Sequence, residues 1–360
     1  MTPKLNYAMA LVIFALAEAL THFGAWRGDS NGYFTIVRFF MGTATPIEWA
    51  QAGHWHGYLR PVVPALAAPL AFLTGARSAI AIVNVAFLMI GTCFTYLLVS
   101  RLFSNNLYGF IAGVCYASAS PNLVWGVAIL TDGPGYAMLA VGFYWLLYHF
   151  KPSWRSSVIT GVLVGTALLV KEITVILVAF LVIQLIFHRS WAYLKSVLIV
   201  VSIAAIMTSA WSFLVVGRTY LNFYGEAVVY AGGSYEGPLA QPRAFLDSII
   251  RAFYMCIPFA IVGFFRLSDE QVKTHVKLLL AGLALLLVFP WIDSRYTFIL
   301  FPAVISMTPI GLDHAASILA SWSWSRFLTR SQWLQLITIA IVVCTNLTFI
   351  KFVNLPYLSG

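Results

Sequence analysis

Long apolar runs, separated by short polar turns, fill most of this chain. A helix needs about 20 mostly apolar residues to cross a bilayer. By that measure the pattern predicts about eleven membrane-spanning helices, near residues 5–23, 79–100, 107–121, 134–150, 157–170, 172–187, 195–216, 246–265, 276–292, 296–312 and 333–351. We therefore expect an all-α protein that crosses a membrane many times.

Two apolar stretches do not fit a single span. Pro61–Leu73 is short and is interrupted by two further prolines, so it predicts an interfacial or half-buried helix and not a span. The run over residues 158–187 is too long for one helix and holds Lys171 and Glu172 near its middle. A charge at the bilayer centre costs roughly 2.5–3.5 kcal/mol. This run therefore predicts two helices with Lys171 in the turn between them.

A short helix is predicted in the loop after the first span. Tyr33, Ile36, Val37 and Phe40 recur at helical spacing, which suits a helix lying at the interface with its apolar face toward lipid. Asp29 stands just before this helix, where an N-cap residue contributes about 1 kcal/mol. From this stretch alone, Asp29 is either a helix cap or a functional acid.

The composition indicates a membrane protein and excludes a soluble one. Of the 360 residues, 61% are hydrophobic and 9% are charged, whereas soluble domains carry about 25% charged residues. No long polar block interrupts the apolar runs, so we expect one integral membrane domain over residues 1–360 without a separate soluble domain. Basic loops and anionic lipid explain the net charge of +9, and no nucleic-acid motif accompanies it.

Charged loop residues predict the orientation. Because Lys and Arg favour cytoplasmic loops, we place the N-terminus in the cytoplasm, although the outer loops also carry basic residues. Most acidic residues then lie outside, namely Asp29, Glu48, Asp132, Glu172, Glu226, Glu236 and Asp293. We expect a multi-pass protein of the plasma (inner) membrane with a functional site on its outer face.

Three turns between apolar runs carry charges. The stretch ILTDGPGYAML holds Asp132 in a sequence that also forms a sharp turn. Lys171 and Glu172 would be a local ion pair or separate functional groups; neighbours in sequence rarely face each other on a helix. The stretch FPWIDSRYTFILFPAVI places Asp293 and Arg295 in a tight turn. Each turn is either local turn chemistry or part of a site.

The stretch GHWHGYLRPVVP raises the question of a metal site. His54 and His56 would face the same way on an extended strand, and Glu48 precedes them, but no third close ligand is evident. Anchoring of the histidines and their aromatic neighbours at the interface is the favoured interpretation. A divalent metal is therefore not favoured, and no other cofactor is indicated.

Taken in order, these motifs resemble those of the GT-C membrane glycosyltransferases, especially the branch holding protein O-mannosyltransferases and lipid A aminoarabinose transferases. A D-x-x-x-Y pattern is matched by Asp29 and Tyr33, and an Arg-Pro-x-x-Pro segment begins at Arg60. The stretch YLLVSRLFSNNLYGFIAGVCYASASP is similar to the family's arginine-Leu-Phe turn and following helix. The motifs LTDG, GVLVGTALLVKE and SRYTFILFP then bring Asp132, Lys171, Arg295, Tyr296 and Pro302. The best-matched module spans about residues 1–190, followed by C-terminal helices over 195–360.

The resemblance implies inverting transfer of a sugar from a polyprenyl-phosphate carrier to a hydroxyl acceptor. It implies Asp29 as general base, with Asp132 orienting the sugar or acceptor or assisting the base. The donor phosphate would be held by Lys171, Arg295 and Arg60, and further substrate contacts would come from Tyr33, Glu172, Tyr296 and Asp293. The implied partners are the lipid-linked donor, membrane lipid, and a glycan, lipid or protein acceptor.

Other interpretations remain open. Ser30 stands where many GT-C relatives carry a second carboxylate, which argues against a doubly acidic, metal-dependent loop. A transporter or flippase of a lipid-linked anionic substrate would also need outer cations in an apolar groove. It should in addition carry charges deep within several spans, where Glu18 is the clear candidate, and internal repeats, which are not evident. A structural membrane subunit would need no outer acid–base pattern.

Overall fold

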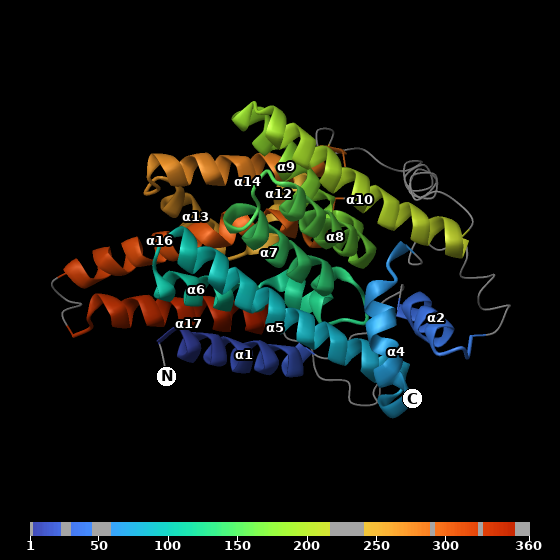
Figure 1. Cartoon of the computed structure of the whole chain (residues 1–360). Coiled ribbons are helices and arrows are strands. Elements are labelled where there is room, and N and C mark those ends of the chain that lie inside the picture. The colour runs from blue at the N-terminus through green and yellow to red at the C-terminus, as the bar shows by residue number, and fades with distance from the viewer. Residues whose placement is uncertain are drawn as a thin grey trace.

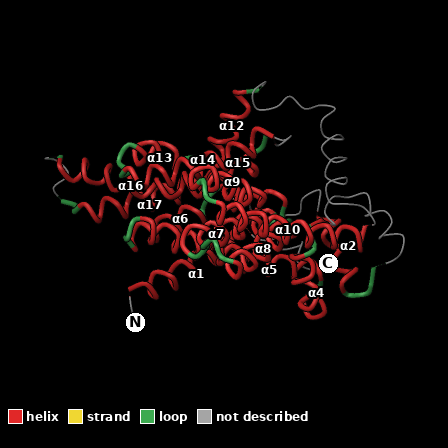
Figure 2. The backbone as a smooth tube through the Cα atoms, turned by 45° about the horizontal axis from the view of Figure 1, so that its top comes forward, coloured by secondary structure: helices red, strands yellow, loops and turns green. Residues whose placement is uncertain are grey.

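The structure is a computed structural model that describes residues 3–22, 30–44, 59–216, 241–288, 292–322 and 327–349. Over these residues the chain consists of helices joined by loops, without a strand (Figure 2). The predicted all-α class is confirmed for the part of the chain that the structure describes.

The helices of the N-terminal part begin with one long helix and two shorter ones before the main bundle. Their bounds are α1 (Pro3–His22), α2 (Ser30–Phe40), α4 (Val62–Thr74), α5 (Ala76–Leu102), α6 (Asn106–Ala117), the π-helical turn η2 (Asn122–Gly126), α7 (Asp132–Tyr148), α8 (Trp154–Val170), the 3-10 turn η3 (Glu172–Val175), α9 (Ile176–His188) and α10 (Trp191–Val216).

The C-terminal helices complete the bundle. Their bounds are α12 (Pro242–Phe253), α13 (Cys256–Phe264), α14 (Asp269–Val288), α15 (Ser294–Thr297), the 3-10 turn η4 (Phe298–Leu300), α16 (Phe301–Ser321) and α17 (Arg330–Phe349). In Figure 1 the helices α1, α14 and α17 run in nearly the same direction across the view, α5 slopes across it, and α2 and α4 lie at the right-hand end of the bundle.

Apolar helices long enough to cross a membrane account for much of the described chain. Five qualify by length and composition: α1, α5, α10, α17 and the continuous stretch from α15 to α16. Shorter apolar helices occur at Val62–Thr74, Asn106–Ala117, Trp154–Val170 and Glu172–His188. The molecule is a polytopic membrane protein, while the span count of about eleven stays a prediction.

The predicted span over residues 246–265 is not one continuous helix. Here α12 and α13 meet at an angle of 96°. The break falls next to Tyr254, a non-glycine residue with φ of 39°, a backbone region that L-residues rarely adopt. Helix α12 is amphipathic, with the exposed Arg243 and Arg251 on one side, whereas α13 is apolar. Because mean hydropathy averages over all faces of a helix, it did not separate the two.

The predicted break at Lys171 is confirmed. Helix α8 ends at Val170, and Lys171 has extended backbone with φ of −161° and ψ of 134°. The side chains of Lys171 and Glu172 then contact different partners, Asp132 and Arg60 respectively. A local Lys171–Glu172 pair is therefore wrong, because the extended residue between two helices sends adjacent side chains in different directions.

Helix α2 forms as predicted, but its apolar face does not point toward lipid. Tyr33, Ile36 and Val37 are each at most 1% exposed and pack in one cluster with Val63 and Ala67 of α4. The helical spacing was a correct indication of a buried face, and the neighbouring helix rather than the bilayer covers it.

Helices α13 and α16 approach one another so closely that backbone touches backbone. A Cβ on Gly263 would lie 2.1 Å from the carbonyl oxygen of Met307, and one on Gly311 would lie 1.9 Å from that of Phe259. Small residues at such crossings are a general device of membrane helix packing. This crossing fixes α16 and, through its N-terminal extension, the turn that carries Arg295.

Candidate active site

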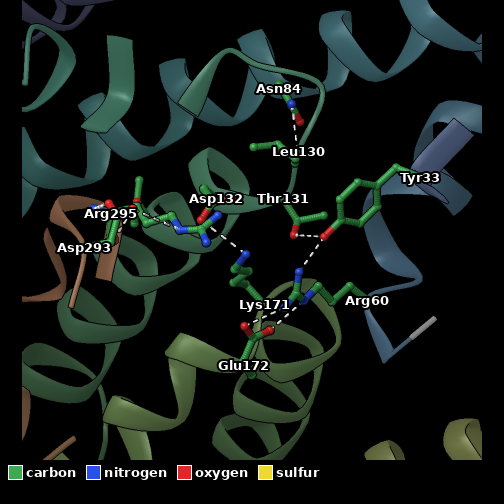
Figure 3. A network of polar contacts seen from close by, with 11 residues as sticks. Tyr33, Arg60, Asn84, Leu130, Thr131, Asp132, Lys171, Glu172, Asp293 and Arg295 are labelled. Carbon is green, nitrogen blue, oxygen red and sulfur yellow. Dashed lines mark hydrogen bonds and ion pairs between the residues drawn. The ribbon is translucent and has the colours of Figure 1, made fainter. Parts of the chain in front are cut away.

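Five of the predicted site residues meet in one buried cluster, drawn in Figure 3. Asp132 begins α7, Lys171 and Glu172 occupy the break between α8 and α9, Arg60 lies just before α4, and Tyr33 lies on α2. These residues come from four separate segments, so the cluster exists only in the folded chain.

The centre of the cluster is an ion pair between Lys171 and Asp132. Lys171 Nζ lies 3.2 Å from Asp132 Oδ1, and each side chain is 2% exposed. No described donor makes a well-aligned hydrogen bond to that oxygen. Asp132 is therefore held by charge while retaining acceptor capacity for a ligand.

A second ion pair joins Arg60 to Glu172. The guanidinium donates to both carboxylate oxygens, from Nε to Oε2 and from Nη2 to Oε1, each at 2.6 Å. Its Nη1 also donates to the hydroxyl of Tyr33 at 2.7 Å. That hydroxyl lies 2.8 Å from Thr131 Oγ1. Arg60 thereby connects α2, the start of α4 and the break after α8.

The backbone leading to Asp132 is held by side chains from other helices. Ser30 Oγ donates to the carbonyl of Ile129 at 3.0 Å. Asn84 Nδ2 donates to the carbonyl of Leu130 at 2.9 Å and to a second carbonyl two residues earlier. These bonds satisfy carbonyl groups of a non-helical segment inside the bundle, where water cannot do so. The position of Asp132 is consequently fixed from two sides.

The turn at Asp132 also depends on a glycine. A Cβ on Gly133 would lie 2.2 Å from the carbonyl oxygen of Gly126. Gly126 is the last residue of the π-helical turn η2. Such turns occur often at functional sites. The close approach leaves no space for a side chain directly after Asp132.

Arg295, in the turn before α16, lies at the edge of the cluster. Its guanidinium carbon lies 4.7 Å from the centre of the Tyr296 ring and 5.1 Å from that of Trp125. Its Nε is 3.8 Å from Asp293 Oδ2. The side chain extends toward Asp132 in Figure 3. With 23% of its side chain exposed, against 2% for Lys171, Arg295 is the more accessible cation.

The electrostatics of the cluster reflect burial and crowded charge. Burial lowers the pKa of Lys171, and the like charges of Arg60 and Arg295 lower this pKa further, against the opposing effect of Asp132. Burial also raises the pKa of Tyr33 to about 12, so its hydroxyl keeps its proton at neutral pH. An anion bound among the three cations would relieve their mutual repulsion.

Several predicted residues lie outside the described part of the chain. These are the candidate base Asp29 and the weak metal candidates Glu48, His54 and His56. Among the described residues, no group of three or more His, Cys, Asp or Glu side chains is arranged to hold a metal ion.

Sequence and structure comparisons complement this geometry. Residues 58–213 match the family model for dolichyl-phosphate-mannose-protein mannosyltransferases, a range that includes Arg60, Asp132 and Lys171. The crystal structure of ArnT from Cupriavidus metallidurans in the apo state is similar over 97% of this chain and 71% of its own, with 13% identity and a TM-score of 0.61. The same enzyme bound to undecaprenyl phosphate is similar over 99% and 73%, with 13% identity and a TM-score of 0.62. No curated protein sequence matches the chain.

The family match over residues 58–213 and the fold shared with ArnT support the resemblance to the GT-C superfamily of membrane glycosyltransferases. The solved structures share its fold at low identity, and the family model covers the segment that supplies most of the cluster. The suspected resemblance is thereby confirmed.

Three residues of this cluster were not predicted from the sequence. Asn84 carried a usable signal, because an amide within an apolar span needs a buried partner. Thr131 and Trp125 carried none: a threonine beside an aspartate and a tryptophan in an apolar run are both common in membrane proteins. Their roles depend on the loop that the fold brings over the cluster.

Replacement of Arg60 by alanine is expected to destabilise the protein strongly. It would leave Glu172 as an unpaired buried charge, and breaking such a pair costs about 3–5 kcal/mol. The measurement is thermal unfolding in detergent, compared with Arg60→Ala/Glu172→Ala, in which neither charge remains. We expect the double variant to recover most of the loss; equal unfolding temperatures for the single variant and the wild type would contradict the role of this pair.

Proposed function

We propose that this GT-C protein transfers a sugar from a polyprenyl-phosphate carrier to a hydroxyl acceptor. The observation that carries the proposal is the convergence of three cations, Lys171, Arg295 and Arg60, beside the buried carboxylate of Asp132 (Figure 3). Negative charge develops on a phosphate leaving group as its bond to the sugar breaks, and preorganised cations stabilise that charge. The undecaprenyl phosphate bound to the similar ArnT supports a lipid-linked donor.

Donor binding would exchange the partner of Lys171. In the present structure its ammonium is paired with Asp132 at 3.2 Å. A donor phosphate brings negative charge of its own and can replace this carboxylate beside the ammonium. Asp132 would then accept a hydrogen bond from a hydroxyl of the sugar or acceptor, or assist the base. In this proposal, donor binding frees the carboxylate of Asp132 from its ion pair with Lys171.

The cations would not contribute equally to donor binding. Arg60 is already bound to both oxygens of Glu172 at 2.6 Å, so we assign the direct phosphate contacts mainly to Lys171 and Arg295. Tyr33 and Glu172 would orient Arg60 for the smaller share that it supplies. On the other side, Tyr296 and Asp293 would flank Arg295 and contact the substrate.

Asp29 is the proposed general base. It precedes Ser30 directly in the chain, and Ser30 is fully buried with its hydroxyl on the carbonyl of Ile129, three residues before Asp132. This connectivity supports a base near the cluster and on a different segment from Lys171. Inversion requires the attacking hydroxyl and the leaving phosphate to lie on opposite faces of the sugar, which two separate segments can provide.

We also propose that transfer takes place on the outer face of the plasma membrane, with the N-terminus in the cytoplasm. The distribution of Lys and Arg between loops supports this orientation. A lipid-linked donor fits such a location, because its sugar and phosphate need no soluble nucleotide-binding domain.

The proposal is tested by measuring polyprenyl phosphate binding to the purified protein and to Arg295→Gln. Loss of the accessible cation should weaken binding about tenfold or more, since one hydrogen bond to a charged group contributes roughly 1.5–3 kcal/mol. Arg251→Gln is the matched control, because Arg251 is 68% exposed and pairs with Asp247, its neighbour on the same helix. Equal affinity of Arg295→Gln and wild type would overturn the assignment of this arginine to the donor phosphate.

The transporter or flippase alternative depends on Glu18, the acid deep within the first span. In the structure, Glu18 Oε1 accepts a hydrogen bond of 2.9 Å from Asn346 Nδ2, which joins α1 to α17. This contact gives Glu18 a role in helix packing. The transporter interpretation thereby loses the support of Glu18, and we favour the transferase.

A further inference from the structure

Helices α1, α6 and α17 enclose an apolar cavity that is separate from the candidate active site. Its volume is about 470 Å³. Aromatic and aliphatic side chains form most of its wall, with Phe14 from α1, Ile111 and Val114 from α6, and Leu334 and Val342 from α17 among them. The cavity is a groove between α1 and α17, which are long enough to span a membrane, and the shorter apolar helix α6.

The groove opens on the side of the helix bundle, away from its interior. Ile339 and Val343 also line it, and they are 56% and 46% exposed. Both belong to α17, a helix that is long and apolar enough to cross the membrane. The opening therefore faces the hydrocarbon of the bilayer.

Polar contacts close one end of the groove. Asn346 Nδ2 donates to Glu18 Oε1 at 2.9 Å, and Asn346 Oδ1 lies 3.1 Å from His22 Nε2, which donates because the amide oxygen can only accept. These bonds hold the C-terminal end of α1 against α17. An acyl chain in the groove would therefore end before it reaches Asn346.

The other end of the groove is polar and basic. Ser331 and Gln335 line it. The neighbouring Arg330 has a side chain that is 58% exposed and pairs with Asp313. One residue further along α16, His314 lies 3.0 Å from the exposed Arg266. Two arginines thus lie near this end of the groove.

We propose that the groove binds one acyl chain of an anionic membrane phospholipid, with its headgroup beside Arg330. The wall on α17 extends from Ser331 to Val343, and twelve residues of helix rise about 18 Å. This is close to half of the ~30 Å hydrocarbon core, the depth that a chain from one leaflet occupies. The gradient from apolar wall to basic mouth matches an anionic lipid.

The groove is distinct from the proposed donor site. Helix α16 begins at Phe301, just after the turn that carries Arg295, and reaches Asp313 twelve residues later, which corresponds to about 18 Å of helix. A headgroup at Arg330 therefore lies toward the opposite end of the bundle from the donor-binding cations. The lipid would support α1 and α17 and would not take part in the transfer reaction.

The test is titration of the delipidated protein with dioleoyl phosphatidylglycerol, dioleoyl phosphatidylcholine or polyprenyl phosphate, followed by native mass spectrometry. Val342→Trp and Ile339→Trp each place an indole in the groove. Leu347→Trp is the matched control, since Leu347 is 70% exposed on the same helix and does not line the groove. Because Ile339 is itself exposed, its variant is decisive if Val342→Trp does not fold.

We expect the groove variants to lose at least tenfold in affinity for the first phosphatidylglycerol, with Leu347→Trp unchanged. Arg330→Gln, which removes this cation and leaves Asp313 hydrogen-bonded to Tyr108, should reduce the preference for phosphatidylglycerol over phosphatidylcholine. Unchanged phosphatidylglycerol binding in both groove variants would overturn the proposal. So would a groove that takes polyprenyl phosphate in preference, or a wild-type dimer that the groove variants abolish.

Discussion

Replacement of Lys171 by methionine is expected to lower kcat/KM for sugar transfer by about 10²- to 10³-fold, the cost of removing one preorganised group that stabilises charge in a transition state. Lys171 is 2% exposed and faces Asp132 in the middle of the cluster. Its loss removes the cation closest to that carboxylate. The measurement is transfer from a polyprenyl-phosphate-linked sugar by the reconstituted protein, together with donor affinity.

Stability must be separated from catalysis in this experiment. Lys171→Met leaves Asp132 as a buried unpaired charge, so the fold is also weakened by about 3–5 kcal/mol. The double variant Lys171→Met/Asp132→Asn removes both charges and should unfold near the wild-type temperature while staying inactive. Lys273→Met is the matched control, because Lys273 is 62% exposed. Donor affinity equal to wild type in the folded double variant would assign Lys171 to structure alone.

Replacement of Asp29 by asparagine is expected to lower kcat by about 10²- to 10⁴-fold, the usual contribution of a general base. Binding of polyprenyl phosphate should be unaffected, because the change removes a proton acceptor and no phosphate-binding cation. The measurement is kcat under saturating donor alongside the dissociation constant of polyprenyl phosphate.

The same experiment decides between the two candidate acids. Asp247→Asn serves as the control, since Asp247 is 56% exposed and pairs with Arg251 on its own helix. If Asp29→Asn retains full transfer while Asp132→Asn abolishes it, the base is Asp132 and the role of Asp29 is that of a helix cap. Loss of donor binding in Asp29→Asn would likewise contradict a pure proton-transfer role.

The two buried ion pairs explain how such a charged cluster exists inside a membrane protein. Each cation is expensive to bury unless it is paired and hydrogen-bonded. Arg60 and Glu172 satisfy one another through two bonds, while Lys171 and Asp132 are joined by charge at 3.2 Å. The second pair is the weaker one geometrically, which is consistent with its proposed exchange for a donor phosphate.

Local patterns predicted many elements of this fold because they report on burial and turn chemistry. The run over residues 158–187 was correctly divided at Lys171, since an isolated charge in a continuous apolar helix costs too much. The run over 246–265 was predicted as one helix, and the structure divides it into two. Its hydropathy is that of a span, but the backbone bends at Tyr254, and tertiary contacts rather than composition determine that bend.

The amino-acid sequence by itself determined the helical membrane class and the turn at Lys171, because apolar periodicity and isolated charges act locally. Only the tertiary structure decided the pairing. It placed Lys171 against Asp132 and Arg60 against Glu172 and covered the apolar face of α2 with α4. Partners so distant in sequence are chosen by which helices pack together, and the energy of that choice depends on burial that no single segment can specify.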